Sequence, residues 1–112
     1  MKNVLFELIY LLLDEKRLFL NPGFSGKDIS GHFFPGASVG ESIVIEEFGC
    51  SLNDLISHYR LQYARNLLAE GFGFEDVWRY SGFKSKRLMT KALSRVVVYK
   101  KNIKFDSNMP EN

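Results

Sequence analysis

The stretch from residue 51 to residue 95 constrains the fold of this chain more than any other feature. Apolar residues at helical spacing predict a long amphipathic helix over 51–69. Ser51 and Asp54 match the N-cap and capping box that begin such a helix, and glycines at 71 and 73 end it. Two short helices are expected next, over 74–80 and 85–96, with a turn between them.

The turn between the two short helices has the residues that a helix-turn-helix motif requires. Gly82 can adopt a positive φ, which a β-carbon would resist. Val77 and Phe83 supply apolar side chains that hold the two helices together, and Ser85 is placed to cap the second one. The sequence therefore predicts a helix-turn-helix in the C-terminal part of the chain.

The second helix of this motif is strongly basic, with five Lys or Arg residues and no acid between positions 84 and 95. Its predicted core-facing residues are Leu88, Met89, Ala92, Leu93 and Val96. Arg87, Lys91 and Arg95 recur every fourth residue and are predicted to face outward. A helix of this kind can enter the major groove of DNA, although a solvated helix surface has the same composition.

The charge distribution separates the two halves of the chain, whose net charge is only +2. Residues 1–59 contain four basic and eight acidic side chains, whereas residues 60–112 contain eleven basic and five acidic ones. The basic half is expected to meet a polyanion. The apolar run over 4–13 is too short to span a bilayer, and the single cysteine, Cys50, is typical of a reducing cytoplasm.

The N-terminal half is also predicted to be helical. A largely buried helix is predicted over 4–17, and Ser25 with Asp28 predicts the start of a short helix over 26–33. After a Pro-Gly break, a weak helix is predicted over 37–48. A strand over 42–48 competes with it, because three β-branched residues follow one another there.

Several of these residues together resemble the DNA-binding domain of the AraC/XylS family of bacterial transcription regulators. The resemblance lies in Arg60-Leu61-x-x-Ala64-x-x-Leu67-Leu68, in Val77, in Ser81-Gly82-Phe83-x-Ser85, and in Gly49-x-Ser51-Leu52 before the long helix. It extends over roughly residues 4–96. It implies an all-α, homeodomain-like fold within residues 1–100, with helix-turn-helix subdomains over 4–50 and 72–98, a linker helix over 51–69, and a polar tail over 101–112.

The resemblance also implies the site residues. The second recognition helix would contact DNA bases through Lys86, Arg87, Leu88 and Lys91. Lys84 and Ser85 would lie at phosphates, with Arg95 nearby. The first recognition helix would present Ser38, Glu41 and Ser42 to the neighbouring groove segment. However, no Lys or Arg occurs between Lys27 and Arg60, so this first motif is acidic and predicted to be poor for DNA.

These patterns predict a cytoplasmic, sequence-specific transcription regulator that binds double-stranded DNA, and possible further contacts include RNA polymerase. The alternative is a degenerate helix-turn-helix module that binds a protein partner. No catalytic set, cofactor or metal site is expected, because His32, His58 and Cys50 are too few for one.

Four phenylalanines, Phe33, Phe34, Phe72 and Phe74, are predicted to be core residues rather than a stacking platform. Trp78 is expected to pack between the two subdomains. Arg60 is expected to tie helices together through carbonyls or an acid.

Overall fold

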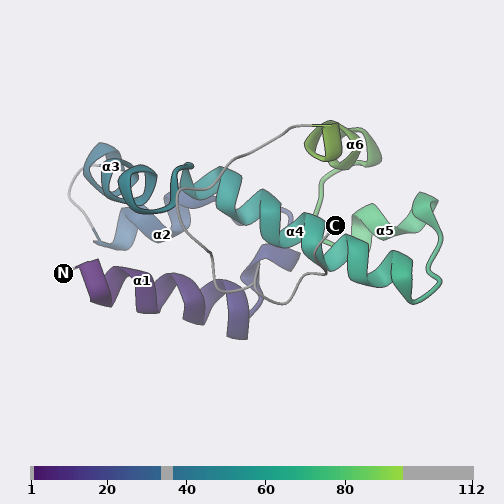
Figure 1. Cartoon of the computed structure of the whole chain (residues 1–112), viewed down its shortest axis with the longest axis horizontal. Coiled ribbons are helices and arrows are strands. Elements are labelled where there is room, and N and C mark those ends of the chain that lie inside the picture. The colour runs from purple at the N-terminus through teal and green to yellow at the C-terminus, as the bar shows by residue number, and fades with distance from the viewer. Residues whose placement is uncertain (1, 34–36, 95–112) are drawn as a thin grey trace.

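A computed structural model describes the backbone of residues 2–33 and 37–94, with side chains from 4 to 31 and from 41 to 94 (Figure 1). Every regular element in these ranges is a helix, which confirms the all-α prediction. None of the described helices is long and apolar enough to cross a membrane. The elements are α1 (Lys2–Tyr10), a π-helical turn η1 (Leu11–Glu15), a 3₁₀ turn η2 (Leu18–Leu20), α2 (Gly26–Phe33), α3 (Ala37–Phe48), α4 (Leu52–Ala69), α5 (Phe74–Tyr80) and α6 (Lys86–Ser94).

The first predicted helix is present, but it ends in an unexpected way. α1 continues into η1, where the Lys16 N–H donates to the Leu11 carbonyl at 2.8 Å, a wider turn than that of an α-helix. Arg17 then takes the left-handed conformation, with φ of 54°, and the chain turns away. The helix therefore stops two residues before the predicted end.

Only one side of this helix is buried. Leu5, Ile9 and Leu13, spaced four residues apart, are at most 1% exposed, whereas Val4 is 55% exposed. Phe6, Leu8, Tyr10 and Leu12 are half-buried against the first cluster, so the prediction of a largely buried helix is only partly correct. Apolar composition alone does not report which residues another element covers.

The helices α2 and α3 agree with the predicted boundaries. The Ser25 N–H donates to the Asp28 carboxylate at 2.8 Å, which is the backward half of the predicted capping box. α3 is helical throughout, so the competing strand prediction is wrong. Val44 is fully buried there, and the packing of this face outweighs the low helix propensity of β-branched residues.

The long helix α4 has both predicted end signals. The Ser51 hydroxyl accepts a hydrogen bond from the Asp54 N–H at 3.1 Å, as an N-cap does. At the other end Gly71 has φ of 102°, and the Phe72 N–H donates to the Leu67 carbonyl at 3.1 Å. This is the hydrogen bond of a Schellman motif, which satisfies carbonyls at the helix end.

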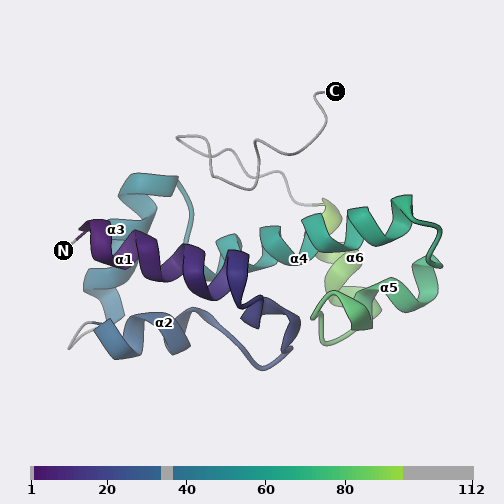
Figure 2. The ribbon, with the colours of Figure 1, turned by 90° about the horizontal axis from the view of Figure 1, so that it is seen from below.

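Two hydrophobic clusters lie along α4. Figure 2 shows α1, α2 and α3 gathered at one end of this helix and α5 and α6 at the other. The first cluster consists of Leu5, Ile9, Leu13, Phe19, Ile29, Val44, Phe48, Cys50, Leu52, Leu55, Ile56 and Tyr59. The second consists of Leu61, Ala64, Val77, Phe83 and Met89, with Leu67, Leu68, Trp78 and Ala92 packed against it. Trp78 therefore belongs to the second cluster, and the prediction that it packs between two subdomains is wrong.

Arg60 ties α4 to η2 and to the loop that follows it. Its Nε donates to the Phe19 carbonyl at 2.7 Å, and its Nη2 donates to the carbonyls of Asn21 and Phe24 at 3.0 Å each. This confirms the prediction that Arg60 ties elements together through carbonyls. Gly82 packs against the same place from the other side, because a β-carbon there would lie 2.1 Å from the Phe19 carbonyl oxygen. We call this contact the junction.

Candidate nucleic-acid interface

The segment from α5 to α6 forms a tight helical pair with a short turn. The Ser81 hydroxyl donates to the Val77 carbonyl at 2.8 Å, and Gly82 follows with φ of 92°. The chain then enters α6, where the Ser85 hydroxyl accepts the Leu88 N–H at 3.1 Å. The predicted roles of Gly82 in the turn and of Ser85 as the N-cap are confirmed.

The outward side of α6 carries basic and hydroxyl side chains. Arg87 and Lys91 are exposed one helical turn apart, and a shallow depression of about 520 Å³ lies beside them. Thr90 and Ser94 also line it, and their hydroxyls donate to carbonyls of α6 itself. Lys84, just before the helix, is exposed as well. Among the described residues no acid forms an ion pair with these three cations.

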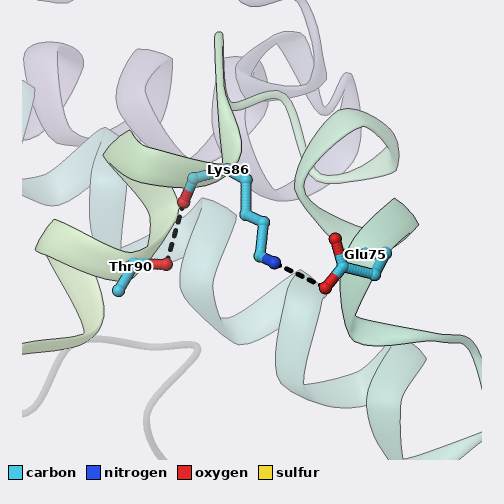
Figure 3. A network of polar contacts seen from close by, with 3 residues as sticks. All are labelled: Glu75, Lys86 and Thr90. Atoms are coloured by element: carbon cyan, nitrogen blue, oxygen red, sulfur yellow. Dashed lines mark hydrogen bonds and ion pairs between the residues drawn. The ribbon is translucent and has the colours of Figure 1, made fainter.

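Lys86 lies differently from the other basic residues of α6. Figure 3 shows its side chain directed toward Glu75 of α5, with which it forms an ion pair. Its ammonium group also lies 5.4 Å from the centre of the Phe74 ring. The charge of Lys86 is thus engaged between α5 and α6 at the surface, and its contact with DNA bases stays a prediction.

The predicted inward stripe of α6 is only partly correct. Met89 is fully buried and Ala92 is half-buried, but Leu88 and Leu93 are 44% and 37% exposed. Only the residues on the side of α6 that contacts the second cluster are buried, and the other apolar residues of the helix are not. Leu88 is thus available at the surface, as the family resemblance implies. Val96 and Arg95 lie outside the described residues.

Two of the three predicted site residues on α3, Glu41 and Ser42, lie within the described side chains. The Glu41 carboxylate accepts the Leu52 N–H at 3.3 Å, so it is directed at the start of α4, where a negative charge is favourable. The contact of Glu41 with a DNA groove stays a prediction. Ser42 is exposed, and the Ser38 side chain lies outside the described residues.

A second hollow, which we call the groove, was not predicted. It has a volume of about 380 Å³. It lies between the loop over 22–25, one side of α4 and the side of α6 that faces α4. Its polar lining consists of Ser25, Asn53, Ser57, Arg60, Lys84 and Lys91. No sequence pattern signals it, because its walls come from three separate segments that only the fold brings together.

The described phenylalanines of the predicted core pair at 72 and 74 lie at the surface. Phe72 and Phe74 are 46% and 39% exposed, so the prediction that they are core residues is wrong. The side chains of Phe33, Phe34 and His32 lie outside the described residues. No group of three or more His, Cys, Asp or Glu side chains in the described part of the chain is arranged to hold a metal ion.

The two candidate recognition helices lie at opposite ends of α4. Figure 1 shows α3 beside the beginning of α4 and α6 above its later part. Comparison with protein-family models, with curated proteins and with solved structures gives no match to this chain. The resemblance to AraC/XylS regulators therefore rests on the residues named above.

Proposed function

We propose that this chain is a sequence-specific DNA-binding transcription regulator that reads the major groove mainly through α6. The observation that carries the proposal is the outward side of this helix, where Arg87 and Lys91 are exposed without an acidic partner among the described residues. Arg and Lys at such positions recognise guanine edges, and Lys84 with Ser85 is placed for phosphates.

The arrangement of the helices supports an AraC-like organisation. Two hydrophobic clusters share α4, with α3 beside its beginning and α6 beside its later part (Figure 1). In this proposal residues 4–50 and 72–98 are two helix-turn-helix subdomains, and α4 is the linker helix. The regulator would act in the cytoplasm, either positioning RNA polymerase or blocking it.

The test is selection from a pool of random duplex DNA at two salt concentrations. The wild-type chain should enrich a motif, and Arg87→Ala should relax one base position by about 1–3 kcal/mol. Arg65→Ala is the matched control, because Arg65 is also exposed but lies on α4. It should leave the motif unchanged. Weak binding that enriches no motif and disappears with modest salt would overturn the proposal.

A protein-binding module is the second candidate, and one observation favours it. Phe72, Phe74 and Tyr80 are 46%, 39% and 51% exposed at the corner between α4 and α5, and the rings of Phe72 and Tyr80 lie 6.1 Å apart. Exposed aromatic groups of this kind are frequent at protein interfaces. Failure of the DNA selection would direct attention to this corner, where Phe72→Ser should then abolish partner binding without unfolding the chain.

A further inference from the structure

The groove beside α6 gathers positive charge without an acid. Arg60, Lys84 and Lys91 all contribute to its lining, and no carboxylate occurs among the described residues that form it. Arg60 is half-buried and bonded only to carbonyls, and this burial lowers its pKa below the ordinary value. A buried cation without a counter-charge is costly, and an anion in the groove would offset that cost.

The groove also presents hydrogen-bond donors that have no partner among the described residues. Arg60 uses Nε and Nη2 at the junction, which leaves the two N–H groups of Nη1. Asn53 accepts the Gly26 N–H through Oδ1 at 2.7 Å, which leaves its amide NH₂. The hydroxyl groups of Ser25 and Ser57 lie in the same lining. Positive charge and several donors together match the requirements of a phosphate group.

The position of the groove indicates where such a phosphate comes from. The major groove is about 12 Å wide and a helix with its side chains is about as thick, so the DNA strands run along both sides of an inserted helix. On one side of α6, Lys86 is engaged with Glu75. On the other side lies the groove, and Lys91 lines both the groove and the outward depression.

We propose that the groove binds a backbone phosphate of the DNA strand that flanks α6. This inference rests on the proposed DNA-binding function and adds a contact from the N-terminal half of the molecule. The DNA backbone is held by Asn53, by Ser57 and by the loop that contains Ser25. In this mode of binding, α3 is not required to read bases. A phosphate contact of this kind strengthens binding to every sequence alike.

A pair of isosteric substitutions on α4 tests the site. Asn53→Asp keeps the oxygen that accepts the Gly26 N–H but replaces the NH₂ donor with a negative charge in the groove. Asn66→Asp makes the same chemical change on the same helix, outside the groove, and keeps the acceptor for Gln62. Each variant adds one negative charge, so any general effect of net charge is the same in both.

Binding to the selected duplex and to a random duplex is measured over a range of KCl concentrations, with thermal unfolding as the check on folding. Asn53→Asp should weaken binding to both duplexes by the same factor, and the slope of log K against log [salt] should fall by about 1. Asn66→Asp should keep the wild-type slope. The enriched motif should stay the same in both variants.

The results separate the failure of the groove from the failure of the function. If wild type enriches a motif but Asn53→Asp binds with the same slope as Asn66→Asp, the phosphate site is refuted and the DNA-binding function stands. If wild type enriches nothing, both proposals fall. As a second measurement, single neutral methylphosphonate linkages are scanned along both DNA strands with wild type and with Asn53→Asp. Linkages that weaken wild type but not Asn53→Asp mark the phosphate in the groove, and their absence refutes the site.

Discussion

Replacing Gly82 with alanine should break the contact between the two ends of the molecule. Gly82 has φ of 92°, a backbone conformation that an L side chain rarely adopts. An added β-carbon would lie 2.1 Å from the Phe19 carbonyl oxygen and 2.9 Å from the Leu20 Cα. Both atoms belong to the backbone of η2, so no side-chain rotation relieves the overlap, and η2 and the turn have to move apart.

The magnitude has two parts. Holding alanine in the left-handed region costs about 1–2 kcal/mol. Moving the Phe19 carbonyl away also disturbs its bond to Arg60 at 2.7 Å, and a hydrogen bond to a charged group is worth about 1.5–3 kcal/mol. The expected loss is about 2.5–5 kcal/mol, which is large against a total stability of about 5–15 kcal/mol.

Gly71→Ala is the matched control, because Gly71 has a similar φ of 102° but no atom within 4 Å of an added β-carbon. Urea unfolding of both variants, followed by far-UV circular dichroism, gives the difference in the free energy of unfolding. Gly71→Ala should lose only the backbone part, about 1–2 kcal/mol. Equal losses in the two variants would refute the close packing of Gly82 against η2.

Two smaller changes in stability follow from the helix ends and from α2, and the same unfolding measurement checks them. Ser51→Ala removes the hydroxyl that accepts the Asp54 N–H at the start of α4, so it should destabilise the chain by about 1 kcal/mol. An unchanged stability would mean that the cap contributes nothing. Gly31→Ala should stabilise by about 0.5–1 kcal/mol, since Gly31 lies inside α2 with open space around an added β-carbon. A loss of stability there would show that the position is more crowded than its surroundings indicate.

The parts of the fold that could be predicted from the sequence are those with a local cause. Ser51 caps α4, Gly71 ends it and Gly82 forms the next turn, because capping hydroxyls and left-handed glycines act within a few residues of themselves. Arg60 was also interpreted correctly, since a long cation in an apolar helix has to find acceptors.

The remaining features depend on partners that are distant in the sequence. Glu41 contacts the start of α4 eleven residues later, and Lys86 is paired with Glu75 of the preceding helix. Neither contact could be predicted from the sequence, because a single helix does not reveal which of its polar residues a neighbouring helix engages. The left-handed Arg17 is a similar case, since this conformation is rare outside glycine and its residue type gives no signal.

The junction also bears on how an acidic first motif and a basic second motif would share one DNA molecule. Arg60 holds η2 and the loop that follows it, and Gly82 packs against the same backbone. In the proposed mode of binding, the N-terminal half is therefore held beside the DNA whenever α6 enters the major groove. No Lys or Arg lies between residues 27 and 60 to attract the DNA backbone. The cations of the groove would compensate, because they lie between α6 and the loop over 22–25, next to the strand that would flank α6.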